Sequence, residues 1–483
     1  MEKSKSVIRN RCSPVLTSSE VLEATGGTLI RGSAEKIFHG VSTDSRNISR
    51  GNFFIPLKGE RFNGHDFLDA AVRAGASGFI AQEDAVDNAN NEGFKDITLI
   101  RVDDTLKALG CIANFWRKKF HIPVVAITGS SGKTTTKEMT AHIAGITKKV
   151  VKTEGNLNNL IGLPLTVFQI TDQHEVAILE MGTNTPGEIG RLTCIAAPDI
   201  GLITNIGPAH LEGFGSIDAI REEKGDLFQQ MPGEGIAIVN RDDGEVGILD
   251  SRWRGKRITF GMKGDADVSA ENISTTGERG VSFTLKMGGT SREITMATVG
   301  LHNIYNALAA AASCRALGME SHTICRGLAT FKPISGRMEV HRLKNGAFLI
   351  DDTYNANPLS VREALKTLNN LKGNHESTVI MADMLELGKM AEEMHETVGS
   401  LMVESGVGNI FLRGSFSRST AEGAIRAGMS EKRIFFPETD DEVVAYLRSS
   451  LKGGDWVLVK GSRKMRMEEI TRGIIRVFGV MEN

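Results

Sequence analysis

The segment from Thr128 to Thr136, TGSSGKTTT, has the residue types of a loop that binds nucleotide phosphates. Its glycines permit a tight turn, and the N–H groups and positive dipole end of a following helix face the phosphates. Lys133 can reach the β- and γ-phosphate oxygens, and Thr134 can ligate Mg²⁺. The longer form of the pattern needs glycine where Ile127 stands, so only the GxxGKT core is present. We predict a nucleotide site formed by Thr128, Gly129, Ser130, Ser131, Gly132, Lys133, Thr134 and Thr135.

A carboxylate and an imidazole follow two neighbouring apolar runs and are candidates for holding metal ions. Glu180 ends the run EVAILE, and His210 lies in NIGPAHL just after the next run. The carboxyl ends of neighbouring parallel strands meet at one sheet edge, where phosphoryl transfer needs the charge of the γ-phosphate neutralised. The alternatives are a solvated carboxylate at a strand end and a hydrogen-bonded histidine in a loop.

Other charged residues could take part, and each has an ordinary alternative. Lys224 lies in IREEKGDLF among acidic residues, which by itself indicates an exposed, ion-paired lysine. Arg337, in SGRMEV, could reach across a cleft to a phosphate or lie on the surface. Asp351 and Asp352 end an apolar run and could hold a ribose hydroxyl.

The elements that must position these residues alternate between strand and helix along most of the chain. Residues 1–110 predict a small α/β unit. Residues 111–331 predict a parallel sheet with right-handed crossovers, an antiparallel extension in the polar stretch 266–299, and a closing helix at HNIYNALAAAASCRALG. Residues 332–483 predict a second parallel, Rossmann-like sheet. We therefore expect three α/β domains, with ligands bound in the clefts between them.

Length and composition agree with three domains and argue against several classes of protein. The chain has 483 residues, 40% of them hydrophobic, which is enough for three cores. A formal charge of −2 gives no sign of a surface that binds nucleic acid. No apolar stretch approaches the length of a membrane span, and we predict a cytoplasmic protein. An odd number of cysteines without a CxxC pair argues against disulfides and a zinc site; they are Cys12, Cys111, Cys194, Cys314 and Cys325.

Together these stretches resemble the Mur ligase family, the ATP-dependent amide-forming enzymes of peptidoglycan assembly, over nearly the whole chain. TGSSGKTT resembles the family motif TGxxGKTT, which also explains the missing first glycine. EMG, NIGPAHL, HNIYN (His302 to Asn306) and GRME follow in the family's order. The resemblance implies a central P-loop domain between a small N-terminal domain that binds UDP and a C-terminal Rossmann-like domain.

The resemblance also implies roles for the matching residues. ATP would be bound with two Mg²⁺ ions, and Lys224 would take up CO₂ as a carbamate, which turns a cation into an anion beside the metals. Asn303 and Asn306 would meet the adenine and phosphate region, and Asp352 rather than Asp351 would hold the ribose. The implied metal ligands are Thr134, Glu180, His210 and carbamylated Lys224, and the implied catalytic residues are Lys133, Lys224, His210 and Arg337.

Motifs in the first and third domains narrow the implied activity. STDSR (Ser42 to Arg46), DDTYNANP and MADMLELG resemble the members that add D-alanyl-D-alanine to UDP-N-acetylmuramoyl-tripeptide through an acyl phosphate. The DNPR-type motif of the diaminopimelate- or lysine-adding members does not occur, and Ala382 stands where glycine is expected. Candidate substrate contacts are Ser45 and Arg46 for UDP, one of Asn156, Asn158 and Asn159, and Asn355, Asn357, Lys460, Ser462 and Arg463 in the third domain.

Two other functions remain open at this stage. A folylpolyglutamate synthase shares the architecture, although its loop usually ends in GKGS. A nucleotide-dependent switch or binding module would need neither a UDP domain nor an HNxxN helix. We expect a monomer with small-molecule substrates, no nucleic-acid partner and no membrane span. The sequence does not decide between diaminopimelate and lysine in the tripeptide.

Overall fold

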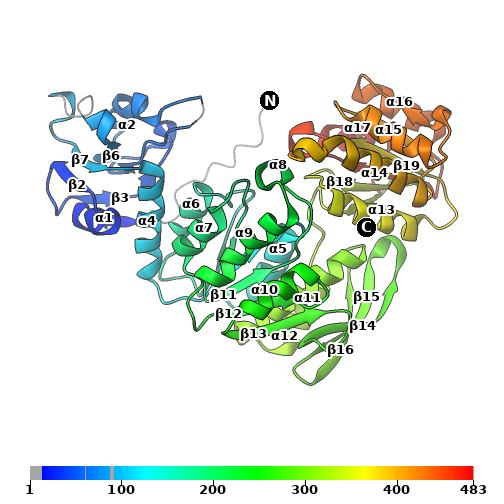
Figure 1. Cartoon of the computed structure of the whole chain (residues 1–483), viewed down its shortest axis with the longest axis horizontal. Helices are drawn as coiled ribbons and strands as arrows, with labels where there is room; N and C mark the ends of the chain where they lie inside the picture. Colours follow the sequence, from blue (N-terminus) through cyan, green and yellow to red (C-terminus); the bar gives the residue numbers. More distant parts are fainter. Residues whose placement is uncertain (1–13, 60, 87–91, 482–483) are drawn as a thin grey trace.

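The protein is described from a computed structural model that covers residues 14–59, 61–86 and 92–481, so Cys12 lies outside the described residues. Three lobes follow one another along the chain (Figure 1). The first lobe lies at the left of the view, the central lobe in the middle and the third lobe at the right. The predicted architecture, a P-loop sheet domain between two smaller α/β lobes, is confirmed.

The first lobe contains a five-stranded sheet and a separate two-stranded pair. Helix α1 (Ser18–Thr25) begins with a capping box between Thr17 and Glu20 and ends at Gly26, whose φ of 65° suits glycine. The sheet order is β2-β7-β6-β5-β4, and β1 pairs with β3. The bounds are β1 Val15–Thr17, β2 Thr28–Arg31, β3 Ile37–His39, β4 Val41–Ser42, β5 Phe53–Phe54, β6 Gly78–Gln82, β7 Thr98–Val102 and α2 Leu68–Arg73.

Helix α4 (Thr105–Lys118) connects the first lobe to the central lobe, and the predicted boundary at residue 110 falls within it. Its apolar face packs against α1 on one side and against α6 (Gly162–Val167) and α7 (Glu188–Ala196) on the other. One continuous core therefore runs from the first lobe into the central lobe.

The central lobe is built on a nine-stranded sheet of order β16-β15-β14-β13-β12-β11-β8-β10-β9. Strand β8 (Val124–Thr128) lies inside it and is buried on both faces. Val124 and Ala126 join one core, whereas Val125 and Ile127 join the other, because successive side chains of a strand point to opposite faces. Both faces of the parallel part are therefore covered by helices.

The helices and the edge of the central sheet differ from the prediction in one respect. The antiparallel extension, β14 to β16, is confirmed. However, α11 (Leu301–Ala316) does not close the lobe, because α12 (Ser321–Thr330) follows it and packs against β16. The other bounds are β9 Val150–Lys152, β10 Val176–Glu180, β11 Ile200–Ile203, β12 Ile236–Asn240, β13 Lys256–Gly261, β14 Val268–Thr275, β15 Val281–Met287, β16 Thr290–Met296, α5 Lys133–Ala144, α8 Leu211–Phe214, α9 Ile217–Gln230 and α10 Gly244–Arg252.

The third lobe is a six-stranded sheet of order β17-β18-β22-β19-β20-β21, parallel except for the edge strand β17. Two separate cores cover its faces. No helix in residues 14–59, 61–86 and 92–481 has the length and apolarity needed to cross a membrane. The bounds are β17 Glu339–Arg342, β18 Phe348–Asp352, β19 Ser377–Ala382, β20 Asn409–Arg413, β21 Ile434–Phe435, β22 Trp456–Lys460, α13 Pro358–Lys372, α14 Ala391–Glu404, α15 Ser417–Arg426, α16 Asp440–Ser450 and α17 Glu468–Phe478.

Candidate active site between the central and third lobes

A cleft of about 850 Å³ lies where the central sheet faces the third lobe. It brings together most of the residues predicted from the sequence. Those that line it are Ser130, Ser131, Gly132, Lys133, Thr134, Thr135, Asn156, Asn158, Asn159, Glu180, His210, Asn303, Asn306, Arg337, Asp352, Asn355, Asn357, Lys460 and Arg463. The predicted residues outside the lining are Ser45, Arg46, Thr128, Gly129, Lys224 and Ser462.

The loop between β8 and α5 needs its two glycines for packing as well as for backbone conformation. Gly129 has φ of 145°, and a Cβ there would lie 1.9 Å from Thr204 Oγ1. Gly132, with φ of 80°, precedes α5, and a Cβ there would lie 2.3 Å from Asn306 Oδ1. Within the described residues, no side chain caps the start of α5. Its first N–H groups can therefore bind an anion.

Lys133 extends back over this loop. Its Nζ donates to the Gly129 carbonyl over 2.6 Å. Burial lowers the pKa of Lys133, Glu180 opposes that shift, and the positive charge of Arg337 adds to it. Two cations and one carboxylate thus lie around the loop. The two cations can bind an anionic ligand, and the carboxylate can bind a cation that the ligand carries.

Glu180 ends β10 at the wall of the cleft, and its carboxylate is only half satisfied by the protein. The residue is 3% exposed, and Oε1 accepts from Asn158 Nδ2 over 2.9 Å. Oε2 is buried without a hydrogen-bond partner in the described part of the chain, and Lys137 Nζ lies 3.9 Å from it. A buried carboxylate oxygen with one long ion-pair contact and no hydrogen bond is costly unless a closer cation binds it. This oxygen therefore fits a hard divalent cation such as Mg²⁺.

His210 lies on the same side of the cleft but contacts the third lobe. It precedes α8 with φ of 55°, and its Nδ1 lies 2.5 Å from Glu386 Oε2. The hydrogen bond from His210 lowers the pKa of Glu386. Glu212 N also donates to the Glu386 carbonyl over 3.1 Å, so two contacts join the lobes here. With Nδ1 engaged, Nε2 is the atom that remains for a metal ion.

Lys224 is buried, so the alternative of an exposed, ion-paired lysine is wrong. It lies on α9, is 2% exposed, and makes no hydrogen bond or ion pair with any described residue. Burial lowers the pKa of Lys224 to about 7, and the nearby charge of Lys133 adds to the shift. Glu223, its acidic neighbour, instead accepts from Gly187 N and Ile189 N at the start of α7. The amine is therefore partly uncharged, and thus nucleophilic, at neutral pH.

Arg337 reaches the phosphate loop from the segment that enters the third lobe. Its guanidinium donates to Thr134 Oγ1 over 2.8 Å and lies 4.0 Å from the centre of the Tyr354 ring. Asn357 Nδ2 makes a second contact across the cleft, to the Ser130 carbonyl at 3.4 Å. The third lobe thus places a fixed positive charge beside Lys133.

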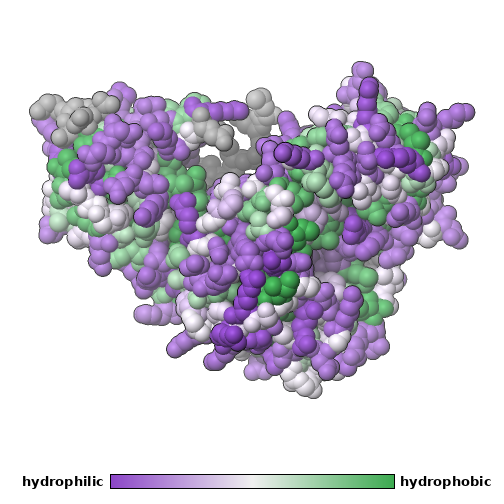
Figure 2. All heavy atoms as spheres, viewed as in Figure 1, coloured by the Kyte–Doolittle hydropathy of each residue, from purple (hydrophilic) through white to green (hydrophobic). Residues whose placement is uncertain are grey.

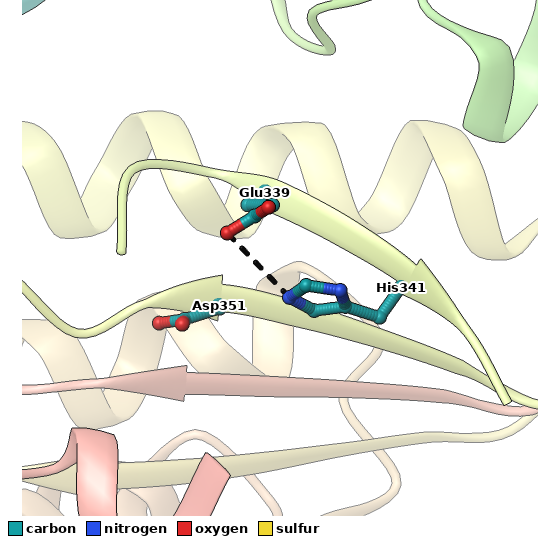
Figure 3. Close-up of side chains that lie close together, drawn as sticks. All are labelled: Glu339, His341 and Asp351. Carbon is teal, nitrogen blue, oxygen red and sulfur yellow. Dashed lines mark ion pairs between the residues drawn. The ribbon is translucent and has the colours of Figure 1, made fainter. Parts of the chain in front are cut away.

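Asp352 and Asp351 are neighbours on β18 and face opposite ways, as residues of a strand must. Asp352 lines the cleft and accepts from Met338 N over 3.2 Å and from Lys460 Nζ over 2.5 Å. Asp351 instead lies near Glu339 and His341 (Figure 3). Burial raises the pKa of Asp351. The geometry thus presents Asp352, rather than Asp351, to a ligand in the cleft.

The HNxxN helix α11 packs on α5 beneath the phosphate loop. Asn306 Nδ2 donates to Asn303 Oδ1 over 3.0 Å, and Asn303 Nδ2 donates to the Val299 carbonyl over 2.8 Å. Thr136 Oγ1 donates to Asn306 Oδ1 over 3.3 Å. These bonds fix both asparagine side chains at the floor of the cleft.

The predicted substrate residues fall into several environments. Asn159 Oδ1 accepts from Gly162 N at the start of α6, so its side chain stabilises the turn that leads into this helix. Lys460 is 1% exposed and holds Asp352, and Ser462 is buried and accepts from Leu385 N. Arg463 and Asn355 line the rim of the cleft. In the first lobe, the Arg46 side chain is 86% exposed and pairs with Asp44.

Sequence reasoning missed several residues that shape the phosphate loop. Asn205 Oδ1 accepts from Ser131 N over 2.9 Å, and Thr204 Oγ1 donates to the Ser131 carbonyl over 2.6 Å. A signal for both existed, because TNIG directly follows the apolar run of β11 and therefore lies at the same sheet edge. Elsewhere in the cleft, Tyr305, whose hydroxyl donates to Asp242 over 2.8 Å, had no such signal.

Comparisons with known proteins agree with this arrangement. Three family models match the chain: Mur ligase family, catalytic domain (residues 37–117), Mur ligase middle domain (127–314), and Mur ligase, glutamate ligase domain (336–463). The UDP-N-acetylmuramoyl-tripeptide–D-alanyl-D-alanine ligase of Bacillus subtilis is 34% identical over 460 residues, which cover 95% of this chain and 98% of the relative. The chain belongs to the Mur ligase family.

Solved Mur ligase structures share the three-lobe arrangement. MurF from Acinetobacter baumannii superposes with a TM-score of 0.86 and 30% identity, covering 96% of this chain and 99% of that chain. MurF ligase from Thermotoga maritima, solved in complex with ADP, gives a TM-score of 0.80 and 28% identity over 90% of this chain and 97% of that chain. The family identified from the sequence motifs is confirmed.

Proposed function

We propose that this protein is an ATP-dependent amide ligase that adds D-alanyl-D-alanine to UDP-N-acetylmuramoyl-tripeptide in peptidoglycan synthesis. The main support is the similarity to D-alanyl-D-alanine ligases over 95% of the chain, together with a cleft lined by Lys133, Arg337 and Glu180, whose Oε2 has no hydrogen-bond partner in the described part of the chain. A carboxylate and an amine do not condense unaided in water, so such an enzyme must first convert the carboxylate to a better acylating group.

The first step is phosphorylation of the substrate. A terminal carboxylate oxygen of the tripeptide attacks the γ-phosphorus of ATP, the bond to the bridging oxygen breaks, and an acyl phosphate and ADP result. Lys133 and Arg337 offset the negative charge that spreads over the transferring group. In the second step, the amine of D-alanyl-D-alanine attacks the acyl carbon through a tetrahedral intermediate, and phosphate leaves with loss of the amine proton.

The metal site is proposed at the wall of the cleft. Thr134, Glu180, His210 and carbamylated Lys224 would hold two Mg²⁺ ions, which when bound neutralise phosphate charge. The carbamate forms when the uncharged Lys224 amine attacks CO₂, a C–N bond forms and a proton is released. A pKa of about 7 makes a substantial fraction of that amine available at neutral pH.

The remaining contacts are assigned by the family resemblance and by position. The rest of the phosphate loop would bind the ATP phosphates, Asn303 and Asn306 would meet the adenine and phosphate region, and Asp352 would hold the ribose. Ser45 and Arg46 are proposed for UDP. The proposed dipeptide and tripeptide contacts are Asn156, Asn158, Asn159, Asn355, Asn357, Lys460, Ser462 and Arg463. We assign UDP binding to residues 1–110, ATP binding to 111–331 and ligation to 332–483, and propose a cytoplasmic monomer.

A product assay tests this proposal. Purified protein is incubated with ATP, Mg²⁺, bicarbonate, D-alanyl-D-alanine and UDP-N-acetylmuramoyl-tripeptide, in parallel with the diaminopimelate and the lysine forms of the tripeptide. We expect mass spectrometry to show the UDP-linked pentapeptide from at least one form. Free D-alanine as acceptor is the matched control and should give no product. Absence of pentapeptide from both forms, in protein that binds ATP, would refute the proposed function.

A further inference from the structure

We propose that Tyr354 is a positioning residue for Arg337, holding the guanidinium at the phosphate loop by stacking; this inference rests on the proposed function. The two side chains come from different segments that meet at the mouth of the third lobe. Arg337 lies between α12 and β17, and Tyr354 lies just after β18. The centre of the Tyr354 ring is 4.0 Å from the guanidinium carbon, within the range of a cation–π contact.

The backbone around Arg337 is anchored on both sides by the same short segment. Tyr354 N donates to the Gly336 carbonyl over 3.0 Å, and Met338 N donates to Asp352 Oδ1 over 3.2 Å. Asp352 is itself held by the buried Lys460. These bonds fix where the Arg337 backbone lies, but they do not fix its long side chain.

The stacked ring supplies the constraint that the backbone does not. A free arginine side chain has many rotamers, and ordering it costs free energy. A planar guanidinium can lie over an aromatic face and still direct its N–H groups outward in its own plane. In this structure one of those groups donates to Thr134 Oγ1 over 2.8 Å. The ring thus pre-organises Arg337 toward the place where the γ-phosphate would lie.

The same ring also has a second cation near it. The Arg463 guanidinium lies 5.7 Å from the ring centre, while its side chain is 61% exposed and pairs with Glu468. The closer contact is therefore the one to Arg337. Tyr354 lines the cleft and is only half-buried, so a smaller apolar residue there leaves the cores of the third lobe intact.

Two variants separate the contribution of the Tyr354 ring from that of its hydroxyl. Tyr354→Leu removes the ring, and Tyr354→Phe keeps it. We expect Tyr354→Leu to weaken binding of a non-hydrolysable ATP analogue, and to lower kcat, by about 2- to 30-fold, the range of a cation–π contact. ADP affinity and the KM values for the tripeptide and dipeptide should change by less than about twofold, because the proposed role of Arg337 is at the γ-phosphate alone. Tyr354→Phe should behave like the native protein.

A double-mutant cycle then tests whether Tyr354 acts through Arg337. In an Arg337→Ala background, Tyr354→Leu should cause less than about a twofold further loss of analogue affinity. Any of three results would overturn the inference. They are losses of analogue affinity that multiply in the double variant, a loss in Tyr354→Phe as large as in Tyr354→Leu, or a loss of ADP affinity as large as that of analogue affinity. If thermal unfolding shows that Tyr354→Leu is not folded, Tyr354→Gln is used with the same expectations. Because nucleotide binding is read directly, the test stays readable if the native protein forms no pentapeptide, an outcome that would refute the proposed function instead.

Discussion

The two sides of the cleft hold their charged residues in different ways. On the central side, Lys133 bonds to the carbonyl of Gly129 only four positions earlier, and two glycines with positive φ fix the loop between them. On the third-lobe side, Arg337 meets Thr134 only because two lobes face each other. The central side is therefore pre-organised by local structure, whereas the third-lobe side depends on how the lobes are placed.

The surface of the molecule is consistent with this difference. In Figure 2 hydrophilic side chains cover most of the visible faces of the central and third lobes, with small hydrophobic areas between them. The central and third lobes share few apolar contacts, such as Val299 in a core of the third lobe and Met390 against the core of the central lobe, whereas the first and central lobes share a whole core through α4. Contacts between the central and third lobes include polar pairs such as His210 with Glu386, and polar contacts are individually weak. Relative movement of these two lobes is therefore the natural way to open the cleft.

The largest expected effect lies on the central side. Lys133→Ala should lower turnover by about 10²- to 10³-fold, since it removes a positioned charge from the transferring phosphoryl group. It should also weaken binding of both ADP and an ATP analogue, because the lysine reaches the β- and γ-phosphates. Steady-state phosphate release and calorimetric titration measure both effects. Lys149→Ala, at an exposed lysine of the same lobe, is the matched control. Near-native turnover in Lys133→Ala would contradict the assignment.

The corresponding change on the third-lobe side should leave a different signature. Arg337→Ala should lower turnover by about 10²-fold, because a cation at the γ-phosphate is lost. ADP affinity should stay near the native value, since the arginine comes from the opposite lobe and its proposed contact is with the terminal phosphate alone. The same titrations with ADP and an ATP analogue provide the measurement. Equal losses of affinity for ADP and for the ATP analogue would show that the two sides of the cleft do not differ in which phosphates they bind.

Lys224, the buried lysine on the central side of the cleft, provides a test of the proposed carbamate. Lys224→Ala should lower turnover by at least about tenfold, because the proposed carbamate ligand of the metal ions is lost. At fixed dissolved CO₂, carbamate formation in the native protein should rise as pH increases through about 7, because only the uncharged amine reacts. A ¹³C NMR spectrum with labelled bicarbonate should show a carbamate signal that disappears in Lys224→Ala and persists in Lys149→Ala. A native protein without that signal would contradict carbamylation.

The smallest expected effect concerns a single contact between the lobes. Glu386→Gln removes the charge opposite His210; the His210 side chain is 23% exposed and that of Glu386 43%. Partly exposed pairs contribute little, so we expect KM for ATP to rise by about 1.5- to 5-fold at low salt and the difference to vanish at high salt. Glu422→Gln, at an exposed position on α15, is the control. A tenfold or larger effect would mean that this contact, rather than the fold of each lobe, organises the cleft.

The sequence predicted the central side better than the third-lobe side, for a physical reason. An apolar run, a glycine loop and a helix form a local pattern, so β8, Lys133 and the strand-end Glu180 could be located from spacing alone. Arg337 and Asp352 needed the family resemblance, because their approach to the loop depends on how two lobes are placed. Tyr354 was missed, since stacking on Arg337 leaves no periodic signal. The burial of Lys224 was also hidden, because its acidic neighbour Glu223 bonds to the start of α7 instead of to the lysine.

The dependence of phosphate release on the two substrates most directly tests whether this protein is the proposed amide ligase. ATP, Mg²⁺ and bicarbonate are supplied with both, either or neither of UDP-N-acetylmuramoyl-tripeptide and D-alanyl-D-alanine. We expect sustained release only when both are present, because the acyl phosphate turns over only when the amine attacks it. Release at the same rate without either substrate would contradict the account and would indicate a nucleotide-dependent switch built on the same phosphate loop.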